Sequence, residues 1–316
     1  MRRPVLFAAG YVNVDLVAEV DCVPDFGERV TARCIYRSPG GMTANLACAA
    51  ARLGLRTRFF GSVGEDEEGD AALVELRRYG VDTGGITRMV RPTTTSIVLL
   101  GPHGDRGIVN EPMVFDYAFL EQALDGFTEE AGCLHIDGYR LPEALWLLRK
   151  ARNLRLVTSA DLDGLNADVL ADLVEEIAPA LDLVFLNKAL ASALAGEPKK
   201  AATKLLALGT RVVAVTLGAE GALVAQPGQM TRVPAASPGV VRDTTGAGDV
   251  FAAAFLALWL GGAEVEQAGR FAVVASGLSV PGVGARGYLP DREEVMEIVR
   301  SEKRWGTRVA ERSDAR

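Results

Sequence analysis

The chain has 316 residues, 49% of them hydrophobic, which suffices for one large core or two modest ones. Its net charge of −7 and pI near 5.1 argue against a nucleic-acid partner bound through bulk electrostatics. The four cysteines include no C-x-x-C pair and only two histidines occur, so neither a disulfide framework nor a zinc site is expected. No apolar stretch reaches the ~20 residues of a membrane span, and no signal-peptide core follows Met1. We therefore expect a cytoplasmic protein without a membrane partner.

Two short polar side chains follow the first predicted strand. Residues 5–9 are apolar and predict a buried strand, which the turn residue Gly10 ends. Asn13 and Asp15 are then expected near the carboxyl end of that strand, where doubly wound folds bind ligands. Asp15 can accept two hydrogen bonds from a polyol, and Asn13 can donate or accept. The alternative is that both residues only form a turn.

The region up to residue 111 mixes helices with extended segments. The pattern predicts helices over residues 42–53 and 65–79 and a strand over residues 58–61. Residues 29–37 and 94–111 look extended instead, and the second segment contains a hairpin. From the pattern alone, these two segments are edge strands of the main sheet or a separate small sheet.

From Cys133 onward, short apolar strands alternate with helices. The predicted strands are residues 134–136, 155–158, 183–186 and 212–215, and the predicted helices are residues 142–151, 166–178 and 198–208. Because such strands are buried on both faces, the alternation predicts an α/β fold with a doubly wound, mostly parallel sheet flanked by helices. We expect residues 1–300 to form a single domain and the polar tail, residues 301–316, to fray. His135 lies inside a predicted strand and is expected to be a hydrogen-bonded core residue.

The segment 242–251 contains a glycine turn that leads into an apolar helix. The first backbone N–H groups of a helix lack partners and lie at the positive end of its dipole, so they bind anions. Gly246 and Gly248 would let the backbone approach a ligand closely. Asp249 would face that anion, where a carboxylate can accept the proton of an attacking hydroxyl. The alternative is a structural N-cap formed by Thr and Asp side chains.

Two motifs carry a resemblance to a known family. Residues 243–249 read D-T-T-G-A-G-D, which matches the D-T-x-G-A-G-D motif of the ribokinase-like, or PfkB, carbohydrate kinases. Residues 40–54 resemble the family's G-G-x-x-x-N-x-A segment and the helix that follows it, ending in L-G. The resemblance extends from Leu6 to about Arg300. It implies a small β lid over the sugar site, formed by residues of about 12–38 and 93–112, and a homodimer that associates through the lid.

The resemblance also implies roles for individual residues. Asp249 would take the proton of a sugar hydroxyl, while the amides of Gly246, Ala247 and Gly248 stabilise the transferring phosphoryl group. The implied sugar-site residues are Asn13, Asp15, Gly40, Gly41, Asn45 and Asp137. Asp137 follows the predicted strand 134–136, and an exposed loop acid is the alternative for it.

For the nucleotide, the resemblance implies a site that holds ATP and its Mg²⁺. Residues 216–221 match the family's T-x-G-x-x-G turn, and the predicted helix 264–280 resembles its adenine wall. The implied nucleotide-site residues are Asn187, Thr216, Gly218, Gly221 and Gly284. In relatives, a monovalent cation such as K⁺ is bound by carbonyls of the turn 281–285 and of the segment beside Asp243 and Thr245.

One position departs from the family pattern, which is N-x-x-E after the strand 183–186. This chain keeps Asn187 but has Leu190 in place of the glutamate that is associated with magnesium and phosphate effects. Asp161 resembles the acid at another family strand end and could replace part of that role.

The sequence thus favours an ATP-dependent kinase that phosphorylates a primary hydroxyl of a sugar or polyol of the ribose or ketohexose class. Neither a P-loop motif nor a dinucleotide-binding motif occurs, which excludes a P-loop kinase and disfavours an oxidoreductase. A nucleoside kinase on the same scaffold and a non-catalytic sugar or nucleotide sensor are the alternatives.

Overall fold

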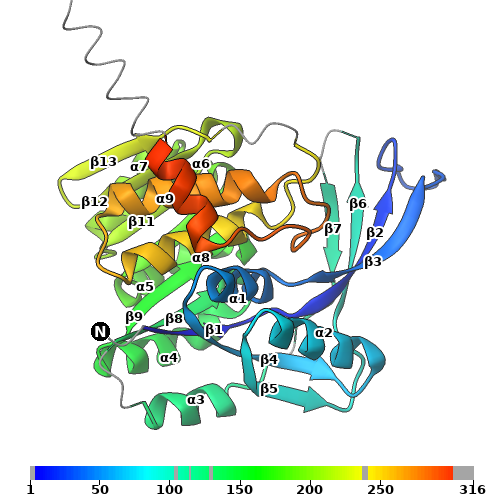
Figure 1. Cartoon of the computed structure of the whole chain (residues 1–316), viewed down its shortest axis with the longest axis horizontal. Coiled ribbons are helices and arrows are strands. Elements are labelled where there is room, and N and C mark those ends of the chain that lie inside the picture. Colours follow the sequence, from blue (N-terminus) through cyan, green and yellow to red (C-terminus); the bar gives the residue numbers. More distant parts are fainter. Residues whose placement is uncertain (1–3, 103–105, 114, 128–130, 237–240, 302–316) are drawn as a thin grey trace, which may run out of the picture.

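The computed structural model describes residues 4–102, 106–113, 115–127, 131–236 and 241–301, and their strands form two sheets (Figure 1). The large sheet has nine strands in the order β13-β12-β11-β10-β9-β8-β1-β4-β5. Its strands are β1 (Val5–Ala9), β4 (Arg56–Gly64), β5 (Asp82–Met89), β8 (Gly132–Asp137), β9 (Val157–Asp161), β10 (Leu183–Asn187), β11 (Val212–Thr216), β12 (Ala222–Gln226) and β13 (Gln229–Val233).

The large sheet is doubly wound, as the sequence predicts. In the spatial order of the sheet, the seven strands β5, β4, β1, β8, β9, β10 and β11 pair in parallel. The strands β12 and β13 add an antiparallel hairpin at the β11 edge. After β1 the chain adds β4 and β5 on one side, and later adds β8 to β11 on the other side. The strand order therefore reverses between β1 and β8, and ligands of such folds bind beyond the carboxyl ends of strands at this point.

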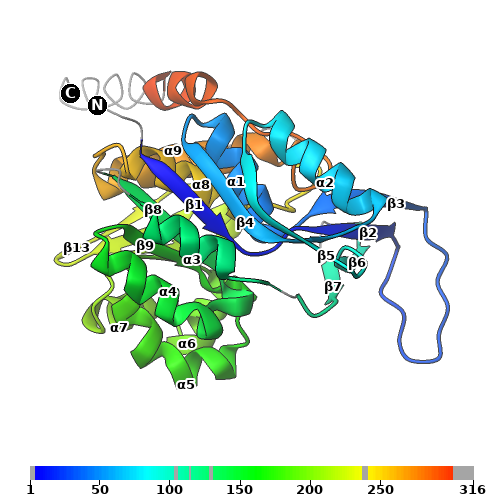
Figure 2. The same cartoon turned by 90° about the horizontal axis from the view of Figure 1, so that it is seen from below.

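Helices cover both faces of the large sheet, as Figure 2 shows. One face packs on α1 (Met42–Arg52), α2 (Glu67–Arg78), α8 (Ala247–Trp259) and α9 (Val265–Ser279). The other packs on α3 (Ala118–Asp125), α4 (Leu141–Asn153), α5 (Ala167–Ile177), α6 (Lys188–Ala195) and α7 (Pro198–Ala207). Alternate residues of β1 enter the two cores, Leu6 and Ala8 on one side and Phe7 on the other. No helix within the described ranges combines the length and hydrophobicity needed to cross a bilayer.

Four strands form the second sheet, in the order β3-β2-β6-β7. Their bounds are β2 (Asn13–Glu19), β3 (Cys34–Gly40), β6 (Thr95–Leu100) and β7 (Arg106–Asn110). The extended segments are thus not edge strands of the main sheet, and this small sheet, the lid, stands beside the large one in Figure 1. Of the predicted hairpin turn, residues 103–105 lie outside the described residues, as do residues 302–316 of the predicted tail.

One expectation about the fold was wrong in its detail. Asn13 and Asp15 do not lie at the carboxyl end of β1 but belong to β2, the first strand of the lid in chain order. The chain turns at Gly10 and leaves the large sheet, so the polar residues approach the site from the lid side.

Candidate active site

Asp137 lies at the point where the strand order reverses, at the carboxyl end of β8 and beside the end of β1. Its side chain is fully buried, which excludes the exposed loop acid. Asp137 Oδ2 accepts hydrogen bonds from the Tyr11 backbone N at 2.7 Å and from Thr43 Oγ1 at 2.7 Å. A Cβ at residue 10 would lie 2.0 Å from this oxygen, so the contact requires Gly10. Burial raises the pKa of Asp137 to about 6.

The other carboxylate oxygen of Asp137, Oδ1, accepts no hydrogen bond of ordinary geometry from the described residues, although the Tyr139 backbone N–H lies close enough to lower the pKa of Asp137. A buried carboxylate oxygen without a donor is costly unless a ligand or water supplies one. Asp137 therefore presents an acceptor for an incoming hydroxyl.

The lid contributes a row of polar side chains on one face. Asp15 of β2, Ser96 of β6 and Asn110 of β7 occupy neighbouring register positions. Asn13 Nδ2 donates to Asp15 Oδ1 at 2.8 Å and to Ser96 Oγ at 2.6 Å, and Ser96 Oγ donates to Asn110 Oδ1 at 2.7 Å. Burial raises the pKa of Asp15. The result is a hydrogen-bonded polar surface that suits a polyol.

Two glycines make room for this surface where β3 meets α1. A Cβ at Gly40 would lie 2.5 Å from Asp15 Oδ1, and a Cβ at Gly41 would lie 2.4 Å from the Tyr11 carbonyl oxygen. Gly41 also has a φ of 101°, which disfavours any other residue. Their role in the structure is close packing around Asp15 and Tyr11.

Asp249 lies in the first turn of α8 and is 8% exposed. Its Oδ2 accepts a hydrogen bond from Asn45 Nδ2 of α1 at 2.7 Å. Burial raises the pKa of Asp249 to about 7, although the Asn45 hydrogen bond and the charges of Arg106 and Arg286 oppose this shift. A carboxyl group with a pKa near 7 is suited to act as a general base at neutral pH.

The turn before α8 is built by glycine rather than by a side-chain cap. Gly246 is the N-cap residue with a left-handed φ of 77°, and no side chain of the described residues caps the helix, so the alternative of a Thr or Asp cap is wrong. The Ala247 amide donates to the Thr244 carbonyl at 3.2 Å, whereas the Gly248 amide has no acceptor within the described residues. A Cβ at Gly248 would meet no atom of the described residues within 4 Å. There is therefore open space on the side of Gly248 where a side chain would stand.

The expected nucleotide-site residues share the carboxyl edge of the large sheet. Asn187 ends β10, pairs with Thr216 of β11, and accepts the Leu190 amide at 2.8 Å as the cap of α6. Gly218 has a φ of 60° with open space around its Cα. Gly221 has a different constraint, because a Cβ there would lie 2.0 Å from the Val233 carbonyl oxygen. Its glycine is thus required by the packing of β12 and β13.

Asp243 joins the two segments expected at the monovalent-cation site. Its Oδ1 accepts the Thr245 amide at 2.8 Å, and its Oδ2 accepts the Gly284 amide at 2.8 Å. Both carboxylate oxygens are thus engaged, and backbone carbonyls are the groups left to bind a cation. Across the part of the chain that the structure describes, no group of three or more His, Cys, Asp and Glu side chains is placed to hold a metal ion.

The position that departs from the family pattern lies in the core. Leu190 is 8% exposed and packs with the apolar side chains on the α3-to-α7 face of the sheet. Asp161, the suggested substitute, is also buried, and Oδ1 of its side chain accepts the Asp163 amide at 3.0 Å. Burial and the neighbouring Asp163 charge raise its pKa well above the usual range. This environment disfavours the ionised carboxylate that a magnesium-linked role would need.

Several residues near the site carried no sequence signal. They are Thr43, Ser96, Arg106, Asn110, Tyr139 and Arg286. Asn110 Nδ2 of the lid donates to Tyr139 Oη at 3.1 Å, and Arg106 Nη1 donates to Thr245 Oγ1 at 3.1 Å. Both bonds cross from the lid to the large sheet or its loops. They depend on the tertiary fold, which no local motif reveals.

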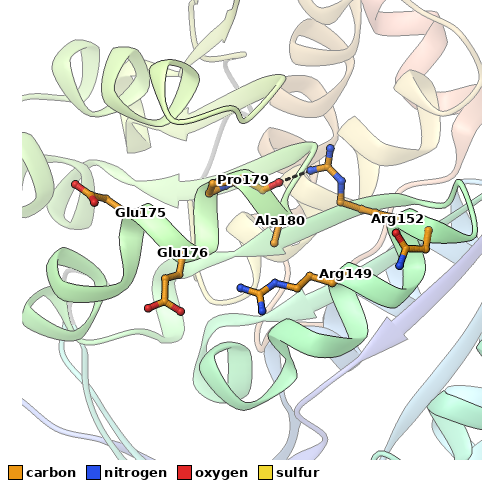
Figure 3. A pocket seen from close by; sticks show the side chains of 7 residues that line it. Arg149, Arg152, Glu175, Glu176, Pro179 and Ala180 are labelled. Atoms are coloured by element: carbon orange, nitrogen blue, oxygen red, sulfur yellow. Dashed lines mark hydrogen bonds between the residues drawn. The ribbon is translucent and has the colours of Figure 1, made fainter.

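A pocket of about 420 Å³ lies elsewhere, between the ends of α4 and α5 (Figure 3). It is lined by Arg149, Arg152, Asn153, Glu175, Glu176, Pro179 and Ala180. Arg152 Nη1 donates to the Pro179 carbonyl. These helix ends lead into the amino ends of β9 and β10, so the pocket is at the edge of the sheet opposite Asp137 and Asp249.

Comparisons with known proteins agree with this geometry. The model of the pfkB family carbohydrate kinases matches residues 5–292. The ATP-dependent ribose-1-phosphate kinase of Halopiger xanaduensis is 31% identical, over 89% of this chain and 93% of that protein. Ribokinase of Arabidopsis thaliana is 29% identical, over 95% of this chain and 82% of that protein. Its structure complexed with ribose and ATP has a TM-score of 0.77 at 25% identity, covering 94% of this chain and 98% of that chain. Motifs, fold and comparisons converge, and the chain belongs to the pfkB family of carbohydrate kinases.

Proposed function

We propose that the protein transfers the γ-phosphoryl group of ATP to a primary hydroxyl of a ribose-like sugar. The observation that carries this proposal is the pairing of a buried carboxyl group with an open amide. Burial raises the pKa of Asp249 to about 7, and Asp249 directly follows Gly248, whose amide has no acceptor within the described residues and whose Cα has open space where a Cβ would stand. This pairing supports the proposal, because a carboxyl group that can accept a proton would stand next to a helix terminus that can bind an anion.

The two substrates would approach this point from opposite sides. The sugar would lie between the polar face of the lid and Asp137, with Asp15 and the open oxygen of Asp137 accepting hydrogen bonds from its hydroxyl groups. ATP would lie along the carboxyl ends of β10 and β11, near Asn187, Thr216 and Gly218. The turn at Gly284 is tied to Asp243 on the same side.

In the proposed reaction, the hydroxyl oxygen attacks the γ-phosphorus and Asp249 accepts the hydroxyl proton. A new O–P bond forms, the bond between the γ-phosphorus and the β,γ-bridging oxygen breaks, and ADP leaves with that electron pair. The amides of Gly246 and Gly248 stabilise the charge on the transferring group, while the Ala247 amide is already held by Thr244. Mg²⁺ bound with ATP would neutralise phosphate charge.

A phosphorylated ribose is a second candidate for the acceptor. The relative with 31% identity is named for ribose 1-phosphate, and the lid of this chain carries an exposed cationic side chain near the site. The Arg106 charge lowers the pKa of both Asp15 and Asp249, which places its guanidinium close to both carboxyl groups. A guanidinium there would pair with an acceptor phosphate.

The test is ATP consumption with ribose, fructose, ribose 1-phosphate and a set of nucleosides. We expect turnover with ribose or ribose 1-phosphate and much less with nucleosides. If ribose 1-phosphate is the acceptor, Arg106→Gln should raise its KM more than tenfold while leaving the KM for ATP unchanged. Turnover only with nucleosides would favour the nucleoside kinase, and ligand binding without turnover would favour the sensor.

The catalytic role of Asp249 has its own test. Asp249→Asn preserves the shape of the side chain but removes its ability to accept a proton. We expect kcat to fall by ~10²–10⁴-fold with binding of ATP retained, because general-base catalysis contributes about that factor. A variant within threefold of the wild-type single-turnover rate would refute the role.

Three further properties belong to the same proposal. A monovalent cation would be held by carbonyls of the segments that Asp243 joins, and activation by K⁺ over Li⁺ would support this. Two chains would associate through the lid, and the reliance on ATP favours a cytoplasmic location.

A further inference from the structure

Arg286 is a buried cation behind the candidate catalytic site. Its side chain is 3% exposed and forms an ion pair with Glu75 of α2 through Nη1. Arg286 Nε donates to Asn45 Oδ1 at 2.8 Å, and Nη2 donates to the Gly40 carbonyl at 2.8 Å. The guanidinium therefore connects α2, α1 and the end of the lid strand β3 at one point.

These contacts determine the orientation of the Asn45 amide. A guanidinium has only donors, so the amide atom that faces it must be the acceptor Oδ1. The amide nitrogen then faces Asp249 and donates to its Oδ2 at 2.7 Å. With the amide reversed, an oxygen would face the carboxylate, and the contact would favour the protonated form of Asp249.

Charged and titratable groups reach Asp249 from several elements. Arg106 of β7 and Arg286 lower its pKa, and Asp163 raises it. Asp161 of β9 and Tyr139 are also within electrostatic range of the Asp249 carboxylate. Of the two cations, Arg106 is exposed on the lid, whereas Arg286 is buried and fixed by three hydrogen-bond acceptors.

We propose that Arg286 is a positioning residue, which orients the Asn45 amide and thereby keeps Asp249 in its proton-accepting form. The inference rests on the proposed function of Asp249. Arg286 touches neither substrate in the proposed arrangement and acts through Asn45. Its hydrogen bond to the Gly40 carbonyl also fixes the backbone that packs on Asp15. The same guanidinium therefore supports Asp249 through Asn45 and Asp15 through Gly40.

The test is the pH dependence of the single-turnover rate for Arg286→Met, which retains most of the apolar stem without the charge or donors. Because this change leaves the Glu75 carboxylate without its cation, Arg286→Met/Glu75→Gln is measured in parallel. We expect the acidic limb to move up by about one pH unit, as for loss of a nearby opposite charge. Activity should then be about tenfold below wild type at pH 6 and within about twofold of it at pH 9.

The conservative and control variants separate positioning from folding. Arg286→Lys keeps a positive charge but cannot make all three hydrogen bonds. The acidic limb of its pH–rate profile should therefore lie between those of Arg286→Met and the wild type. Arg52→Met removes an arginine of α1 whose Nε donates a hydrogen bond to the Leu289 carbonyl, away from Asp249. This variant should not move the acidic limb. Thermal unfolding confirms that each variant is folded.

The results separate a failure of the positioning role of Arg286 from a failure of the proposed function. A loss of rate that is equal at every pH, or an unchanged limb in both Arg286→Met variants, would overturn the positioning role alone. An active Asp249→Asn variant would overturn the proposed function itself, whatever the Arg286 variants do.

Discussion

Carboxyl groups gather where the strand order reverses, and burial raises the pKa of Asp15, Asp137, Asp161 and Asp249. Each would be easier to bury if it were neutral or hydrogen-bonded. Asp137 accepts hydrogen bonds from Tyr11 and Thr43 through one oxygen, whereas Asp249 accepts one from Asn45. The two carboxyl groups therefore differ in their hydrogen bonding, which fits the proposed roles of Asp137 in sugar binding and of Asp249 in proton transfer.

The raised pKa of Asp249 predicts a specific pH dependence. Only the ionised carboxylate accepts a proton, so kcat/KM should fall as the pH drops through about 7, by about tenfold per pH unit below it. The measurement is kcat/KM from pH 5 to 9 at saturating Mg²⁺. An acidic limb centred below pH 5 would contradict the buried environment of Asp249.

At the scale of residues, the sequence predicted what its contiguous motifs contain. Asp249 and the glycines before it were found because local turn and helix chemistry places them together. Arg286 was missed because its partners Gly40, Asn45 and Glu75 are brought to it only by the fold. Ser96 and Asn110 were missed for the same reason, since strand register aligns them with Asp15.

At the scale of elements, the entry into α8 distinguishes two glycines with different tasks. Gly246 has a φ of 77° and a Cβ there would lie 2.7 Å from the Ala285 carbonyl oxygen. Gly246→Ala should therefore lower the free energy of unfolding by about 1–3 kcal/mol. Gly248 lies within the helix, and Gly248→Ala should leave stability equal or slightly higher, since alanine favours helices.

In catalysis, Gly248→Ala should be impaired even though its stability is unchanged. The methyl group of Gly248→Ala would enter the open space at Gly248 and displace the phosphoryl group from its proposed position, so kcat should fall by about 10²-fold without loss of stability. Denaturant unfolding and single-turnover assays of both variants measure the contrast. Full activity of Gly248→Ala would show that no phosphoryl group approaches this amide.

The predicted elements agree with the structure where periodicity is strong and differ where a turn is unusual. Residues 155–158 were predicted as a strand, but β9 covers Val157–Asp161. Arg155 has a φ of 62° and ends the turn after α4, a conformation that its side chain does not predict. The hairpin β12–β13 was not recognised as part of the sheet, because its pairing with β11 depends on tertiary context.

At the scale of the whole molecule, one face of the lid carries the polar row around Asp15, and the other carries several exposed apolar side chains together with the exposed Arg37. Asn13 and Asp15 lie on one face of β2, so Leu16 lies on the other, in register with Ile97 and then Val109. Val109 is 66% exposed and Ile97 is 46% exposed. Ile35 of β3, in register with Ala18 on the same face, is 64% exposed. Exposed apolar side chains gathered on one sheet face favour an interface, which supports the proposed homodimer.

Val109→Glu tests this association, because a charge buried in an apolar interface without a partner is strongly unfavourable. We expect the wild type to sediment at twice the 33.5 kDa mass of one chain at micromolar concentration, and the variant to be monomeric or at least about 100-fold weaker in dimerisation.

The matched control is Val74→Glu on α2, since Val74 is 65% exposed and lies outside the lid. A control variant that also dissociates would place the interface elsewhere. A dimeric Val109→Glu variant, or a monomeric wild type, would show that the apolar lid face is not a dimer surface. The proposed sugar site would then be formed by one chain, in which Arg106 of the lid donates a hydrogen bond to Thr245 beside α8.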